Sequence, residues 1–155
     1  MSGTQTSGPT IDAILEAFFV ERVVSASPMR QRRLRSLEYR LRDCLEVEGE
    51  RILVTADLEL LASEREFDPD GAFCRTMRAD DLLFALPGFV ERYVPEDLTD
   101  TRLQLATIEV LTAWLLRRRL IDQWRLECTL LDLEVALRHG RADLRRRRRE
   151  VRAEA

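Results

Sequence analysis

Apolar residues recur every three or four positions along most of this chain, as they do in helices that bury one face. Only 6 glycines and 5 prolines occur among 155 residues, so few positions interrupt such helices. Leucine is the main apolar residue, and it favours helix over strand. The pattern predicts an all-α fold: a single compact orthogonal bundle of about five to six helices, with at most minor β content.

Composition divides the chain into three parts. Residues 1–9 are polar and are interpreted as a flexible leader. Residues 10–140 carry the helical periodicity and form one predicted domain. Residues 141–155 form an arginine-rich C-terminal tail. A chain of this length fits one domain, so no second domain is expected.

Capping and helix-breaking residues mark individual helices within the domain. Ser27 followed by Pro28 predicts a helix start, because serine caps the end and proline suits the first turn. That helix should run to about Glu48, before a glycine. Further on, Pro87-Gly88 predicts an interruption of a helix that begins near residue 80.

The segment Trp124–Leu137 carries apolar residues on two faces if it is helical. The first stripe comprises Leu126, Leu130, Leu133, Leu137 and Leu144. The second stripe, roughly 200° away, comprises Trp124, Cys128, Leu131 and Val135. Such a helix must be sandwiched, for example by a partner chain. The same residues also alternate as in a strand with a bulge, but leucine and glutamate favour helix.

Charge is unevenly spread along the chain, although the net charge is only −3. Residues 52–100 hold twelve acids and four arginines, a net −8. Residues 101–155 hold thirteen arginines and eight acids, a net +5. The acidic middle and the basic end should therefore attract each other, within one chain or between two.

Two groups of basic residues are candidate binding sites. On the predicted second helix they are Arg32, Arg35 and Arg42, with Tyr39 between them, and near the C-terminus they are Arg145, Arg146, Arg147, Arg148 and Arg149. Arginine binds phosphate and carboxylate equally well, so nucleic acid and an acidic protein surface both fit. A solvated helix face and a frayed tail would give the same pattern.

Catalytic and metal-binding signatures are missing from the sequence. It contains no phosphate-binding glycine loop, nucleophile elbow or metalloprotease motif. The single histidine, His139, is expected to cap the end of a helix. Cys44, Cys74 and Cys128 lack the close spacing of zinc ligands, so no cofactor is expected. The chain is predicted not to be an enzyme, although a carboxylate-based enzyme would show only as clustered, perturbed acids in a cleft.

Location and source are predicted from composition. The first ten residues do not resemble a signal peptide, and no apolar stretch reaches the ~20 residues of a membrane span. Three widely spaced cysteines fit a reducing cytoplasm. All 25 basic residues are arginine and asparagine is absent as well, which predicts a high-GC bacterial genome.

Three stretches resemble the helical core-binding domain of tyrosine recombinases. They are TIDAILEAFFVERVVSASPMRQRRLRSLEYRLRDCL, VTADLELL and RLQLATIEVLTAWLLRRRLID, within residues 10–122. In that family such helices clamp DNA through basic faces, so the resemblance implies DNA binding. Residues 66–98 look inserted and the recombinase catalytic domain is missing, so no catalytic residue is transferred.

Two functions follow as expectations. The first is a non-catalytic protein–protein interaction or self-associating module, with a homodimer or another protein as partner. The doubly apolar segment and the uneven charge along the chain both favour this interpretation. The alternative is a nucleic-acid-binding protein that uses the basic second helix and the arginine-rich tail. No membrane partner is expected.

Overall fold

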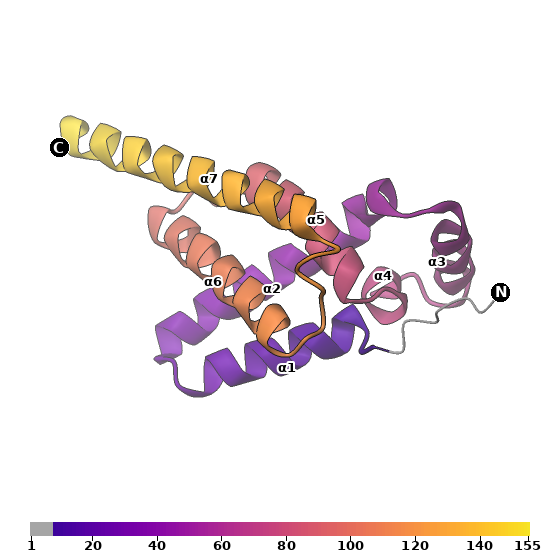
Figure 1. Ribbon diagram of the computed structural model, residues 1–155. Coiled ribbons are helices and arrows are strands. Elements are labelled where there is room, and N and C mark those ends of the chain that lie inside the picture. Colours follow the sequence, from indigo (N-terminus) through magenta and orange to yellow (C-terminus); the bar gives the residue numbers. More distant parts are fainter. Residues whose placement is uncertain (1–7) are drawn as a thin grey trace.

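The computed structural model describes residues 8–155, which form seven α-helices and one short 3₁₀ helix (Figure 1). They are α1 (Ile11–Val24), α2 (Pro28–Glu48), η1 (Gly49–Ile52), α3 (Thr55–Phe67), α4 (Ala72–Thr76), α5 (Ala79–Arg92), α6 (Leu98–Arg117) and α7 (Glu127–Glu154). The all-α prediction is confirmed, with one helix more than the five to six expected. The only β-type pairing in these residues is an isolated bridge between Thr10 and Arg78. Most of the predicted leader, residues 1–7, lies outside the described residues.

Helix α2 forms where its capping residues predict. The Ser27 hydroxyl accepts a hydrogen bond from the Arg30 amide at 3.3 Å, and Pro28 occupies the first turn. The leucines spaced three and four residues apart along α2 are buried. The helix ends at Gly49, where a Cβ would collide with the Phe73 ring. Close packing against α4 therefore requires glycine at this position.

Helix α5 continues through Pro87-Gly88 to Arg92, so the predicted interruption is wrong. Proline removes one backbone donor from a helix, which costs about 3 kcal/mol in an isolated helix interior. In α5, Leu86 before the proline and Phe89 after it are fully buried. Core packing on both sides of Pro87 holds the backbone helical.

The core joins the N-terminal helices to α6. The Phe18 ring of α1 lies edge-on to the Trp114 ring of α6, with centroids 5.7 Å apart. Trp114 also donates a hydrogen bond from Nε1 to the Glu21 carboxylate at 3.2 Å. An aromatic pair of this kind stabilises by about 1 kcal/mol beyond its buried area. The contact fixes α6 against α1 and so positions the surface on which α7 lies.

Helix α7 lies across α5 and α6, and its C-terminal end extends past them (Figure 1). The helical interpretation of the doubly apolar segment is confirmed from Glu127 onward. Gly140 sits where a Cβ would press on the Leu105 side chain of α6, so glycine allows the close approach of the two helices. The helix continues past residue 140 to Glu154, so residues 141–154 are helical.

Candidate interaction surface

The inner face of α7 belongs to the core. Leu133 is 1% exposed, and Leu126, Leu137 and Leu144 are also buried. Leu130, from the same predicted stripe, is partly buried and packs against the core. These five leucines are the first of the two stripes, and the rest of this chain covers them.

The outer face of α7 carries the second stripe, which this chain leaves uncovered. Leu131 is 53% exposed and Val135 is 44% exposed. Cys128 is also exposed, one turn before Leu131. We call Cys128, Leu131 and Val135 the outer stripe of α7. Trp124, in the turn just before the helix, is 77% exposed. Large apolar side chains grouped on one surface are typical of interaction sites.

A shallow groove of about 380 Å³ runs between α6 and α7. Its apolar lining includes Leu116 of α6 and Leu137 of α7. Two ion pairs flank it: Arg141 contacts Glu109 across the groove, and Arg138 lies 3.5 Å from Glu134 on α7. The groove is open to solvent, and Arg145 in its lining has no ion pair among residues 8–155, so the groove extends the uncovered apolar area without forming a closed ligand pocket.

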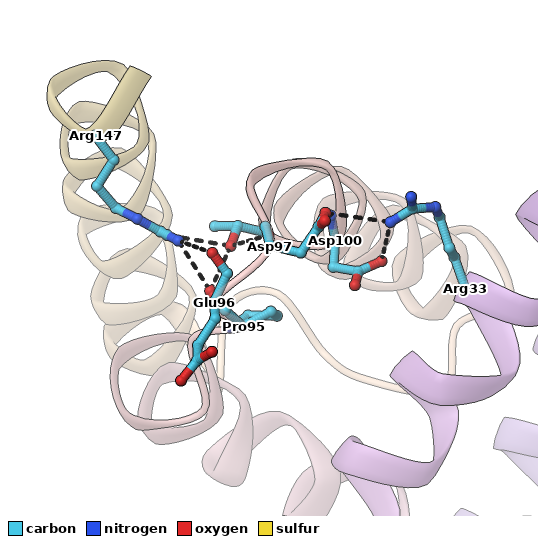
Figure 2. Close-up of polar contacts among 7 residues, drawn as sticks. Arg33, Pro95, Glu96, Asp97, Asp100 and Arg147 are labelled. Atoms are coloured by element: carbon cyan, nitrogen blue, oxygen red, sulfur yellow. Dashed lines mark hydrogen bonds and ion pairs between the residues drawn. The ribbon is translucent and has the colours of Figure 1, made fainter. Parts of the chain in front are cut away.

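The five consecutive arginines of α7 do not share one environment. Arg147 turns inward and donates hydrogen bonds to the carbonyl oxygens of Glu96 and Pro95, at 2.7 and 3.1 Å (Figure 2). It also donates to the Thr101 hydroxyl at 3.2 Å. Guanidinium groups suit this task because their five N–H donors form a rigid fork. Arg147 therefore ties α7 to the α5–α6 turn, residues 93–97.

Arg33 of α2 holds the same region from the opposite side (Figure 2). Its guanidinium donates to the Asp100 carboxylate at 2.7 Å and to the Asp97 carboxylate at 3.2 Å. The hydrogen bond from Arg33 to Asp100 raises the pKa of Arg33. Asp97 caps α6, and the hydrogen bond from the Asp100 amide is the main cause of its lowered pKa. Arg33 and Arg147 thus hold the α5–α6 turn between α2 and α7.

The remaining arginines of the run point toward solvent to differing degrees. Arg145, Arg146 and Arg149 are exposed, and Arg148 is partly buried. Arg146 pairs within the helix with Asp143. No ion pair in residues 8–155 engages Arg145, Arg148 or Arg149. These three are the arginines of the run that remain available to a partner.

The predicted basic face of α2 is only partly free. Arg32 and Arg35 are exposed, without an ion pair in the described part of the chain, and Tyr39 is 74% exposed. Arg42 instead contacts Asp12 at 2.6 Å and Glu38 at 2.9 Å. Burial alone would lower the pKa of Arg42, but these two hydrogen bonds outweigh it and raise that pKa. Arg42 therefore holds α2 to α1.

A cleft of about 1090 Å³ is lined by three aspartates, Asp57, Asp80 and Asp81. Burial, reinforced by the two neighbouring carboxylates, raises the pKa of Asp81, although its hydrogen bond from the Arg78 amide opposes this. That hydrogen bond is part of the N-terminal cap of α5. Asp80 pairs with Arg125. Two of the three carboxylates thus have structural partners.

The three cysteines are free thiols, two of them buried and Cys128 exposed. Burial, with a neighbouring Glu48, raises the pKa of Cys44 to about 12, and burial with Glu46 does the same for Cys74. His139 is exposed in the middle of α7, so the prediction that it caps a helix end is wrong. Residues 8–155 contain no cluster of three or more potential metal ligands.

One exposed apolar region lies on α3 and is not predicted from the sequence. Only Leu61 of this helix is buried, whereas Leu60 is half exposed and Phe67 is almost fully exposed. The sign of this exposed region in the sequence is that the leucines at positions 58, 60 and 61 do not fall on one helical face. α3 lies at the edge of the molecule, on the side opposite the C-terminal end of α7 (Figure 1).

Among the described helices, none has the length and apolar composition needed to cross a membrane. Comparisons with protein-family models, curated proteins and solved structures find no match to this chain. Its surfaces and their charges therefore carry the functional argument.

Proposed function

We propose that this chain is a non-catalytic interaction protein that self-associates through the outer face of α7. The observation that carries the proposal is the outer stripe, whose Leu131 and Val135 are about half exposed, whereas the inner stripe packs on the core. Burying such side chains against a second chain is favourable by roughly 25 cal/mol per Å² of apolar surface. The neighbouring Trp124 adds the residue type most often found at the energetic centre of interfaces.

The size of a stable interface sets how far the contact must extend. A standard interface buries roughly 800 Å² per partner, more than three side chains of the outer stripe can supply. Helix α7 has 28 residues and is about 42 Å long at ~1.5 Å per residue. A contact along most of that length, together with the turn that holds Trp124, can reach the required area.

Light scattering coupled to size exclusion, over a range of protein concentrations, tests the proposal. The wild type should be a dimer that dissociates on dilution, and a Leu131→Arg/Val135→Arg variant should stay monomeric. Arginine is a good helix former, so α7 should keep its helicity, which circular dichroism checks. The matched control is Leu60→Arg on α3, because Leu60 is 50% exposed and Leu131 is 53% exposed.

Two results would contradict the proposal. A wild type that is monomeric at high concentration removes its basis. A dimer lost through Leu60→Arg but retained in the α7 variant would place the interface on α3 instead.

A second candidate function is nucleic-acid binding, favoured by the exposed Arg32, Arg35 and Tyr39 on α2, where neither arginine forms an ion pair within residues 8–155. The arginines would follow a phosphate backbone and the tyrosine would stack on a base. The resemblance to recombinase core-binding domains favours DNA as the ligand. If both arginines contact phosphates, Arg32→Ala/Arg35→Ala should reduce the slope of log affinity against log salt by about 1.8. Arg102→Ala/Arg117→Ala is the control. No binding to duplex or single strands at low salt would exclude this function.

We infer a bacterial cytoplasm as the place of action. The exposed thiol of Cys128, without a disulfide partner among the described residues, fits a reducing compartment. The exclusive use of arginine fits a high-GC bacterial source. Fractionation of the source cells with an antibody against the chain tests this location.

A further inference from the structure

Helix α7 is divided into an acidic and a basic half. Residues 127–137 contain three acids, Glu127, Asp132 and Glu134, and no arginine. Residues 138–154 contain eight arginines and three acids. Within one chain the centres of the two halves are about 21 Å apart along the helix, at ~1.5 Å per residue, so they meet only at their boundary, where Arg138 contacts Glu134. A second helix of the same kind can neutralise both.

We propose that two copies of the chain pair through α7 in an antiparallel arrangement, each acidic half lying against the basic half of the other. The inference rests on the proposed self-association and specifies its geometry. A parallel pair would place acid against acid and arginine against arginine, which is unfavourable. The antiparallel pair also sets the two helix dipoles in opposite directions.

The outer positions of α7 define a register for this pair. They follow a seven-residue repeat and comprise Cys128, Leu131, Val135, Arg138, Ala142, Arg145, Arg149 and Arg152. A two-fold axis beside residue 140 sets Leu131 opposite Arg149 and Val135 opposite Arg145 of the second copy. Because the repeat is symmetric about this point, every outer position meets another outer position.

In this register Arg145 and Arg149 can make contacts through both the aliphatic stem and the charged end of the side chain. Arg145 and Arg149 have no ion pair within residues 8–155, so their guanidinium groups are available. Their aliphatic stems can cover Val135 and Leu131, while the charged ends reach Asp132 and Glu134. The small Ala142 near the axis allows the two backbones to approach closely.

The remainder of the fold leaves space for this arrangement. α7 lies on the surface of the molecule, with α5 and α6 on its inner face (Figure 1). The two copies would therefore lie on opposite sides of the paired helices. The C-terminal part of α7, which extends past the other helices, would reach the acidic half of its partner.

Cys128 provides a direct test, because it is exposed on the outer stripe while Cys44 and Cys74 are buried. In the antiparallel register the two Cys128 residues lie 24 residues apart along the pair, about 36 Å at ~1.5 Å per residue. A short bismaleimide cannot join them. The substitution Ala153→Cys adds a thiol near the C-terminal end of α7. In this register the added thiol lies next to Cys128 of the second copy, so the reagent should join the two readily.

The expected result is about tenfold more cross-linked dimer with Ala153→Cys than with the wild type, measured on a denaturing gel, since only the variant places two thiols within ~10 Å of each other. The control Cys128→Ser/Ala153→Cys should lose the cross-link, because two thiols at position 153 are again far apart. Light scattering on the same samples reports whether dimers form at all.

Each other outcome has a distinct meaning. Cross-linking of the wild type through Cys128 alone would show a parallel pair, or an antiparallel pair centred on the outer stripe, and either would overturn the inference, while self-association would stand. A dimer without any cross-link would place the interface on another surface and overturn it equally. Monomers in every sample would contradict the proposed function itself.

Discussion

The inner and outer faces of α7 have similar residues and opposite surroundings. Leu133 on the inner face is buried against α5 and α6, and Leu131, two residues earlier on the outer face, is half exposed. Both belong to apolar stripes with the same spacing, so periodicity does not say which face the chain itself covers. The covered stripe is the longer one, reaching Leu144, whereas the outer stripe changes to arginine after Val135. The length of a stripe thus indicates whether a helix packs on its own fold.

The largest expected difference between the faces concerns thiol reactivity. Cys128 on the outer face should react with a thiol reagent in the native protein at neutral pH, one thiol per chain. Cys44 and Cys74, with their pKa raised to about 12, remain protonated and buried and should react at least ~1000-fold more slowly. Their reactive thiolate forms only as the pH approaches about 12. Mass spectrometry of labelled protein, native and in denaturant, measures this.

A result of three reactive thiols in the native protein would contradict the packing of the core. Slower labelling of Cys128 at high protein concentration would instead sharpen the comparison, because it would place this thiol in the self-association interface.

The next largest effect is on stability. Leu133→Ala should lower the free energy of unfolding by about 2–5 kcal/mol, since it leaves a cavity in the core. Leu131→Ala, the same change on the outer face, should stay within about 0.5 kcal/mol. Urea denaturation should be measured at a concentration where the wild type is monomeric, so that the dimer does not contribute. Equal losses from the two variants would mean that Leu131 is packed within its own chain.

Charge reversal on the outer face should weaken the dimer by about ten- to a hundredfold in Kd, equivalent to ~1.4–2.7 kcal/mol. Arg145→Glu/Arg149→Glu sets acids against acids in the antiparallel pair, and Asp132→Arg/Glu134→Arg sets arginines against arginines. Combining all four changes in one chain should restore the dimer, because opposite charges face each other again. Analytical ultracentrifugation measures each Kd. No recovery in the combined variant would argue against the pairing of opposite halves.

The smallest effect separates two arginines of the same run. Arg147→Ala should lower the free energy of unfolding by about 1–2 kcal/mol, since it removes charged hydrogen bonds to the partly buried α5–α6 turn. Arg149→Ala, two residues later and exposed, should change it by less than about 0.5 kcal/mol. Thermal or urea unfolding of the two variants gives the comparison. Similar values would mean that the contacts of Arg147 contribute little to stability.

Local signals were enough to predict the helices and the two stripes of α7. Ser27 and Pro28 act on their own neighbours, so the start of α2 could be read directly. The continuation of α5 through Pro87 could not, because it depends on core contacts made by Leu86 and Phe89. The position of His139 within a helix could not be predicted for the same reason. The helix continues past His139 because Leu144, farther along it, is buried.

The candidate surface was predicted less completely than the fold. The sequence grouped Leu131 with Leu133 as self-association residues, and only the packing of α7 on α5 and α6 separates them. It also grouped five consecutive arginines as one basic feature. Their division into Arg147 and the outward residues needs both the helical phase and the position of the α5–α6 turn, which is about 50 residues away in the chain.

The distance along the chain between Arg147 and the α5–α6 turn affects the order in which these contacts form during synthesis. During synthesis residues 95–101 leave the ribosome well before Arg147, which follows the Glu96 carbonyl it contacts by 51 positions. Domains begin to fold from the N-terminus as they emerge, so Arg33 can bind Asp97 and Asp100 first. Until residue 147 has been added, the turn is held from one side only. A nascent chain paused before this point would expose the surface of α5 and α6 that α7 later covers, which makes that interval the one in which a chaperone would be needed most.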